Sequence, residues 1–155
     1  MNPAFLHEAI RLSVENMEMN NGGPFGAVIV RDQQIIARGW NTVSATNDPT
    51  AHAEIVAIRD ACARLKTFTL AGCEIYSSCE PCPMCLSAIY WARLGRIYYA
   101  ANREDANAAE FDDDKLYREL TLPIGNRSIP MVQSLREEAC AAFHAWMKKP
   151  DRIKY

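Results

Sequence analysis

Two short segments, His52-Ala53-Glu54 and Pro81-Cys82-Pro83-Met84-Cys85, restrict the fold of this chain more than any other feature. An imidazole and two thiols this far apart in sequence can serve one metal ion only if the fold brings both segments together. Cys82 and Cys85 are three positions apart, so at the start of a helix their side chains share one face. A helix N-terminus also stabilises thiolates through its N–H groups and its dipole. We therefore expect two helix starts that meet at the same edge of a sheet.

This ligand set indicates zinc with one coordination position left for water. Structural zinc sites are normally closed by four protein ligands, whereas catalytic sites keep a position open. His52, Cys82 and Cys85 supply three ligands, and the two segments offer no obvious fourth. Zinc lowers the pKa of bound water from about 16 to about 7, and a neighbouring carboxylate can then move the proton. Glu54 is the candidate for that proton transfer.

Other interpretations of these cysteines remain open. Cys79, Cys82 and Cys85 resemble the beginning of an iron–sulfur sequence, although a fourth cysteine at the expected distance is absent. Cys79 could also close the zinc site as a fourth ligand. A disulfide framework suits small secreted scaffolds better than a domain with a full core.

Length and composition fit one soluble domain. With 155 residues the chain can bury a full core, so we expect a single domain over residues 1–155. A formal net charge of −2 provides no field that would attract a polyanion, which argues against a nucleic-acid partner. No run of about eighteen apolar residues predicts a membrane span, and the first residues lack the layout of a signal peptide. These features indicate a cytoplasmic location.

Hydrophobic periodicity and turn residues predict alternating helices and strands. Leu6, Ile10 and Val14 recur at helical spacing, and two strands then follow as a hairpin. The hairpin should be antiparallel, and later strands separated by helices should be parallel. We expect an α/β fold with one mixed five-stranded sheet covered by helices on both faces. The expected strands are residues 26–30, 34–38, 74–78, 96–100 and 129–133, and the expected helices are residues 4–19, about 51–65, 83–94, 112–120 and 135–148.

The motifs resemble those of the cytidine-deaminase-like superfamily, where His-x-Glu followed by Pro-Cys-x-x-Cys marks zinc-dependent nucleobase deaminases. More closely, the chain resembles the small bacterial guanine deaminases of that superfamily over nearly its whole length. The zinc motifs are specific to the superfamily, whereas two features near and at the end of the sequence point towards guanine. The shared stretches are residues 22–30, 47–54, 78–86 and 88–93, followed by Phe111-Asp112-Asp113 and Tyr155.

The resemblance implies a three-layer α/β/α sandwich and hydrolysis of guanine to xanthine and ammonia. The attacking group would be a zinc-bound hydroxide, with Glu54 as proton shuttle and one zinc ion per subunit. The resemblance also implies a homodimer in which the segment from about residue 135 to residue 155 is exchanged. Tyr155 would then close the active site of the partner subunit.

The resemblance further assigns roles in substrate binding. Asn41 would hydrogen-bond the purine, and Phe25 would lie against its ring. Asp113 would lie near the amino group as a binding and proton-transfer residue. Trp91 would line the pocket. Without the family pattern, each of these residues has an ordinary structural interpretation as a turn, core or surface residue.

Competing functions remain open at this stage. A tRNA adenosine deaminase would apply the same zinc chemistry to a flipped base, but the acidic run at residues 112–114 would repel an anticodon phosphate. Cytosine and related amino-azines present a chemically similar amidine. A non-enzymatic zinc- or purine-binding module would require Glu54 to be idle.

Overall fold

The structure is a computed structural model that describes residues 1–154. The chain divides into two compact units, Met1–Tyr117 and Arg118–Tyr155. Within residues 1–154, no helix combines the length and the apolar character needed to cross a membrane. The elements are α1 (Pro3–Glu18), β1 (Gly26–Arg31), β2 (Gln34–Trp40), α2 (Val43–Thr46), α3 (Ala53–Leu65), β3 (Glu74–Cys79), α4 (Pro83–Trp91), β4 (Arg96–Ala101), α5 (Arg103–Ala108), α6 (Asp113–Thr121), the 3₁₀ turn η1 (Ile124–Asn126) and α7 (Arg136–Lys148).

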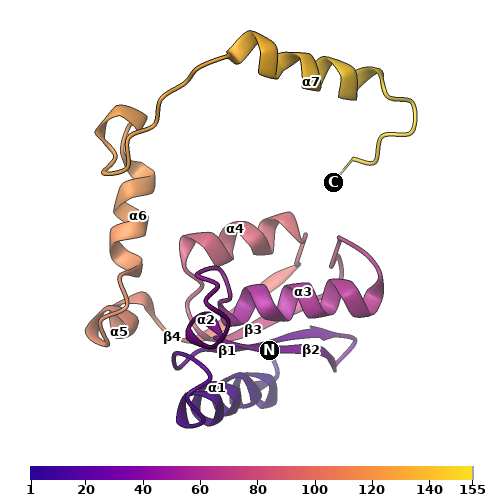
Figure 1. Cartoon of the computed structure of the whole chain (residues 1–155). Helices are drawn as coiled ribbons and strands as arrows, with labels where there is room; N and C mark the ends of the chain where they lie inside the picture. The colour runs from indigo at the N-terminus through magenta and orange to yellow at the C-terminus, as the bar shows by residue number, and fades with distance from the viewer. Residues whose placement is uncertain (155) are drawn as a thin grey trace. The chain divides into compact units, whose positions relative to one another are not determined.

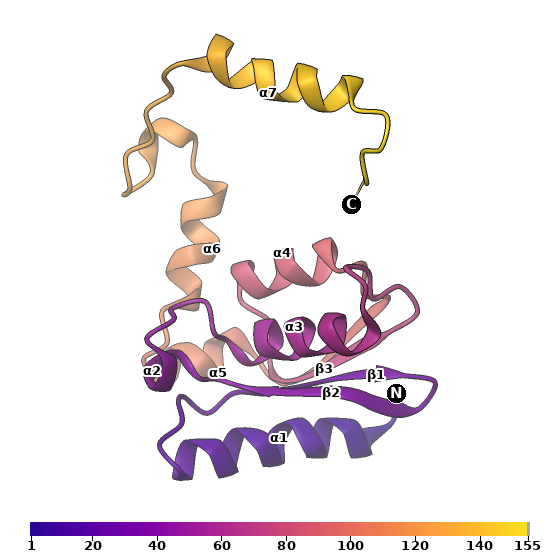
Figure 2. The same ribbon diagram turned by 45° about the vertical axis from the view of Figure 1, so that its right-hand side comes forward.

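A mixed sheet forms the centre of the first unit. Among the described residues it has four strands in the order β2-β1-β3-β4. β1 runs antiparallel to both β2 and β3, whereas β3 and β4 are parallel. α1 covers one face of the sheet, and α3 and α4 lie on the other (Figure 1 and Figure 2). The predicted three-layer α/β/α arrangement and the predicted strand directions are confirmed.

The sheet has one strand fewer than the sequence predicted. Residues 129–133, expected to form the fifth strand, adopt no regular structure. Pro130 in this segment has no N–H to donate to a ladder. The described elements of the segment's own unit, from Arg118 onwards, are helical, so none of them offers a strand for pairing. A strand-like sequence pattern does not produce a strand where no neighbouring strand is available for hydrogen bonding.

The central strand β1 explains why the sheet carries helices on both faces. Ala27 and Ile29 pack in the cluster that includes α3, and Val28 and Val30 pack in the cluster that includes α1. These four side chains are at most 1% exposed. Burying an aliphatic side chain of this kind stabilises the fold by about 1.5–3 kcal/mol. The near-continuous apolar run of β1 is therefore the sequence signature of a strand buried on both sides.

Helix α3, which begins beside the first ligand motif, lies unusually close to the sheet. A Cβ atom at Gly39 of β2 would lie 2.2 Å from the carbonyl oxygen of Ala53 and 2.5 Å from the backbone nitrogen of Ala57. Only glycine permits that approach. The contact sets the height of the first turn of α3 above the sheet, and that turn carries Glu54.

The second unit consists of the end of α6, the η1 turn and α7. On α7, Phe143, Trp146 and Met147 stand at spacings of three and four residues and therefore share one face. Their exposed fractions are 69%, 41% and 58%. Within its own unit, helix α7 therefore presents an apolar face that is not buried.

Candidate active site

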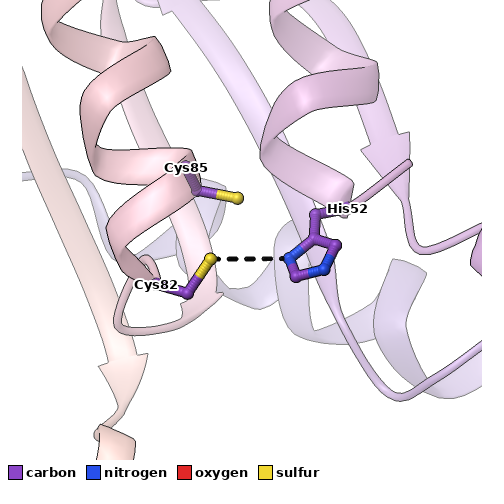
Figure 3. A group of neighbouring side chains, drawn as sticks. All are labelled: His52, Cys82 and Cys85. Atoms are coloured by element: carbon purple, nitrogen blue, oxygen red, sulfur yellow. Dashed lines mark hydrogen bonds between the residues drawn. The ribbon is translucent and has the colours of Figure 1, made fainter. Parts of the chain in front are cut away.

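His52, Cys82 and Cys85 come together where α3 and α4 begin (Figure 3). His52 is the N-cap of α3 and Cys82 is the N-cap of α4, with Cys85 in the first turn. The possible ligand atoms of the three residues all lie within 4.8 Å of one another. The Sγ atom of Cys82 is 3.7 Å from Nδ1 of His52. The two helix starts thus meet at one edge of the sheet, as expected from the predicted fold.

The electrostatics of this group favour a thiolate. Hydrogen bonding from Cys85, and then from His52, lowers the pKa of the Cys82 thiol to about 4 against the opposing effect of burial. The interaction with Cys82 raises the pKa of His52 and also that of Cys85. One sulfur is therefore charged at neutral pH and the second keeps its proton until a cation displaces it. A coordinated thiol is deprotonated outright, so a divalent metal would be held by two thiolates and one imidazole.

This donor set fits zinc. Two cysteine sulfurs and one histidine nitrogen, with a fourth position left for water, match the ligation of catalytic zinc sites. Cys79 is not part of the group. Its thiol donates to the carbonyl oxygen of Asn102 at 3.5 Å, and burial raises its pKa to about 11. Cys79 is therefore placed as a neutral buried thiol and not as a fourth ligand.

Glu54 lies beside this group in the first turn of α3, and its side chain is only 5% exposed. Burial raises the pKa of its carboxyl group. Ser77 of β3, which is 1% exposed, donates its hydroxyl hydrogen to Oε1 of Glu54 at 3.0 Å. A carboxyl with a raised pKa, held in one orientation, is suited to take up a proton and release it again. Sequence reasoning did not identify Ser77.

A cavity of about 260 Å³ opens beside the ligand group. It brings together most of the residues that the sequence singled out, from the two motifs, from the end of β2 and from the start of α6. Five further residues lie in its wall without having been assigned a role from the sequence: Gly23, Val43, Ser44, Glu80 and Phe111. The lining residues are Gly23, Phe25, Asn41, Val43, Ser44, His52, Glu54, Glu80, Cys82, Phe111 and Asp113.

The orientation of the Asn41 side chain in the cavity wall is determined by the backbone. Its Oδ1 atom accepts hydrogen bonds from the backbone N–H groups of Gly23 and Val43, both at 3.2 Å. Because two donors meet the oxygen, the amide nitrogen is the atom that can donate to a ligand. A Cβ atom at Gly22 would lie 2.1 Å from the carbonyl oxygen of Asn41. The paired glycines, which look like simple turn formers in the sequence, therefore serve to orient Asn41.

Two aromatic rings form an apolar wall of the same cavity. Phe25 and Phe111 meet edge to face, with ring centroids 4.7 Å apart and planes at 81°. Both rings are partly buried and both line the cavity. Such a wall suits a flat, weakly polar ring system. Phe111 lies two residues before Asp113. This closeness in the sequence could have identified Phe111 as a residue of the cavity.

Asp113 is the first residue of α6, and it also lines the cavity. Burial raises the pKa of its carboxyl group, and the negative charge of Cys82 raises it further. Glu80 adds a third carboxylate to the wall beside Glu54 and Asp113. Its Oε2 atom accepts a hydrogen bond from the backbone N–H of Arg103 at 3.1 Å.

Among the predicted substrate-binding residues that the structure describes, Trp91 does not line this cavity. Trp91 is the last residue of α4 and is 64% exposed. It follows Cys85 by six residues, which on a helix corresponds to about 9 Å along the axis and about 240° of rotation. Trp91 therefore does not line the cavity of its own chain. Tyr155 lies outside the described residues, so its predicted role as a lid stays a prediction.

Comparison with known proteins agrees with this geometry. Residues 2–101, which include all three ligand residues, match the family model of the cytidine and deoxycytidylate deaminase zinc-binding region. The chain is also 49% identical over 151 residues to the guanine deaminase of Bacillus subtilis (strain 168), and the match covers 97% of both chains. The chain belongs to the cytidine and deoxycytidylate deaminase family. It is therefore a zinc-dependent deaminase, a hydrolase that acts on C–N bonds.

Solved structures of deaminases extend this relationship. The X-ray structure of the Bacillus subtilis guanine deaminase superimposes with a TM-score of 0.96 and covers 100% of this chain and 99% of that one. The guanine deaminase from Nitrosomonas europaea is 30% identical, with a TM-score of 0.68 over 94% of this chain and 84% of that one. The tRNA-specific adenosine deaminase of Aquifex aeolicus is 42% identical over 97 residues, which are 63% of this chain and 64% of the relative. The deaminase core is thus shared widely, and the region beyond it is shared with the guanine deaminases.

Proposed function

We propose that this deaminase hydrolyses guanine to xanthine and ammonia. The observation that carries the proposal is the near-complete match to a guanine deaminase, with 49% identity over 97% of the chain and a TM-score of 0.96. The match to the tRNA deaminase of Aquifex aeolicus covers 63% of the chain. Phe111 and Asp113, which line the cavity, lie beyond the zinc-binding region that ends at residue 101.

The cavity supports a small planar purine as the substrate. Its volume of about 260 Å³ lies just below the range of ligand pockets, which are commonly about 300–1,000 Å³. A single base suits this size better than a nucleotide. Phe25 and Phe111 offer an apolar wall to the ring faces, and Asn41 offers a donor to an acceptor on the ring edge.

The reaction adds water to the guanine carbon that carries the amino group, and the C–N bond then breaks to leave a carbonyl and ammonia. Zinc held by His52, Cys82 and Cys85 would supply a water that is activated at neutral pH. Glu54 takes a proton from the attacking water and returns it to the departing amino group. Ser77 holds the Glu54 carboxyl in place through the hydrogen bond at 3.0 Å. Asp113, with its raised pKa, binds the amino group and assists its protonation.

Three further expectations belong to this proposal. Each subunit would hold one zinc ion, and the enzyme would act in the cytoplasm. The enzyme would be a homodimer that exchanges the segment from about residue 135 to residue 155. The apolar face of α7, with Phe143 69% exposed, supports the exchange because it needs a covering surface. In such a dimer Tyr155 would close the active site of the partner subunit.

A substrate panel tests the proposed function. The zinc-loaded enzyme is incubated with guanine, adenine, cytosine and a tRNA that carries a wobble adenosine, and the products are separated chromatographically. We expect xanthine from guanine and no inosine in the tRNA. Inosine formation without any xanthine would instead establish the tRNA adenosine deaminase activity. The matched variant Glu54→Gln should retain its zinc and lose turnover, whereas unchanged turnover would remove Glu54 from the mechanism.

A further inference from the structure

A tyrosine outside the cavity wall is connected to the catalytic motif. The hydroxyl of Tyr117 donates a hydrogen bond to the carbonyl oxygen of Pro81 at 2.9 Å. Pro81 directly precedes Cys82 in the chain, so this bond joins α6 to the loop that carries a metal ligand. Tyr117 does not line the cavity. The hydroxyl therefore connects two parts of the protein, and other residues bind the substrate.

Tyr117 shares a helix face with Asp113. The two residues are four positions apart on α6, which places their side chains one above the other. The face of α6 that presents Asp113 to the cavity is thus the face that Tyr117 fastens to Pro81. A shift of α6 away from the loop would move Asp113 away from the cavity.

A second connection secures the beginning of the same segment. The backbone N–H of Arg103 donates to Glu80, the residue before Pro81, at 3.1 Å. The guanidinium carbon of Arg103 lies 5.0 Å from the ring centroid of Tyr117, which is a cation–π distance. Glu80 and Pro81 therefore hold the two ends of residues 103–117. Phe111 lies within this segment, just before α6.

Tyr117 adds a contact on α6 itself to the contacts that hold the segment before it. Before α6, the backbone N–H of Phe111 donates to the carbonyl oxygen of Ala106 at 3.0 Å, and the Phe111 ring packs against Phe25. The Tyr117 hydroxyl and the stacked Arg103 hold α6 itself, on the face that also carries Asp113.

We propose that Tyr117 is a positioning residue that holds Asp113 at the active site by fastening α6 to the loop before Cys82. This inference rests on the proposed function, in which Asp113 binds the amino group of guanine. Tyr117 acts through Asp113 and touches neither the substrate nor the metal. Arg103 keeps the ring of Tyr117 in place.

The test compares Tyr117→Phe with the wild-type holoenzyme. The substitution keeps the ring under Arg103 and removes only the hydroxyl. Loss of one hydrogen bond of this kind should lower kcat for guanine about fivefold, while the zinc content and Tm stay close to those of the wild type. Tyr99→Phe is the matched control, because Tyr99 is 48% exposed on β4 and lies outside the cavity wall. The control should show wild-type kcat.

A double-mutant cycle separates positioning from a general structural role. The kcat/KM values of Asp113→Asn and of Asp113→Asn/Tyr117→Phe are measured by accumulating xanthine over long incubations. If Tyr117 acts through Asp113, the second substitution causes no further loss in the Asp113→Asn background. An equal fivefold loss in both backgrounds, or an unchanged kcat in Tyr117→Phe, would overturn the inference. A wild-type enzyme without any activity on guanine would refute the proposed function itself, which is a different result.

Discussion

Replacing Ser77 with alanine should separate catalysis from stability at this site. Ser77 is 1% exposed on β3, and its hydroxyl donates to Oε1 of Glu54 at 3.0 Å. Ser78, the next residue, is 8% exposed, and its Oγ atom accepts a hydrogen bond from the backbone N–H of Gly26 at 2.9 Å. Adjacent strand residues point to opposite faces of a sheet. The two serines therefore form a matched pair, one bonded to the Glu54 carboxyl and one to the backbone.

The size of the effect follows from the kind of bond that is lost. A hydrogen bond to a charged group contributes about 1.5–3 kcal/mol, which corresponds to roughly 10- to 150-fold in rate. Ser77→Ala should lower kcat for guanine by about this factor, because Glu54 loses the group that orients it. The KM for guanine should change little, since Ser77 does not line the cavity.

The assay is a steady-state measurement of xanthine formation, made together with metal analysis and thermal unfolding. Ser78→Ala should lower Tm and leave kcat near the wild-type value. The argument is refuted if Ser77→Ala keeps kcat within twofold of the wild type while it retains zinc. It is also refuted if Ser78→Ala loses as much kcat as Ser77→Ala, because the loss would then reflect damage to β3.

Three other predictions concern recognition, metal content and pH. Gly22→Ala should raise KM for guanine roughly tenfold without loss of zinc, because its Cβ would lie 2.1 Å from the carbonyl oxygen of Asn41; steady-state kinetics would show this. Removal of zinc by a chelator should abolish turnover, and titration should restore full activity at one zinc per chain; restoration at half that ratio would contradict one site per subunit. Hydrogen bonds from Arg11 and Arg38 lower the pKa of Glu8 from 4.5 to about 2, so its stabilisation is present above pH 4.5 and is lost as pH falls towards 2. Glu8→Gln should therefore lower the free energy of unfolding, measured in urea at pH 7, by about 1 kcal/mol. This figure is reduced because the two arginine partners are half-exposed. The difference between the variant and the wild type should become smaller towards pH 3.

Local features of the sequence predicted five of the helices and the antiparallel hairpin, but not the short helices α2 and α5. The meeting of the two motifs was inferred from the expected fold. Pro83 and the spacing of Cys82 and Cys85 determine a helix start through backbone geometry alone, so they could be interpreted without a structure. The bond between Ser77 and Glu54 could not, because it depends on how α3 is placed over β3. The orientation of Asn41 likewise depends on a contact with Gly23, eighteen positions earlier in the chain.

The differences between prediction and structure have the same physical origin. Residues 129–133 have the composition of a strand, but a strand forms only where a neighbour completes its hydrogen bonds. Trp91 lies in a stretch shared with the family, but the helical rotation between Cys85 and Trp91 places it outside the cavity of its own chain, so its predicted role in the pocket stays a prediction. In both cases the pattern was local and the outcome depended on tertiary placement.

The way in which Asn41 is held has a consequence for how substrate preference can evolve. Two backbone N–H groups bind its carbonyl oxygen, and an aspartate at the same position could accept both bonds equally well. Asn41→Asp, which needs only one nucleotide change in the codon, would therefore keep the loop intact and replace a donor by an acceptor. That variant should be assayed against a set of amino-heterocycles. Its turnover of guanine should fall, and it should favour rings that present an N–H to the side chain at position 41. The two backbone N–H groups hold the side chain at this position in place. Whether the side chain donates or accepts a hydrogen bond then depends on a single atom.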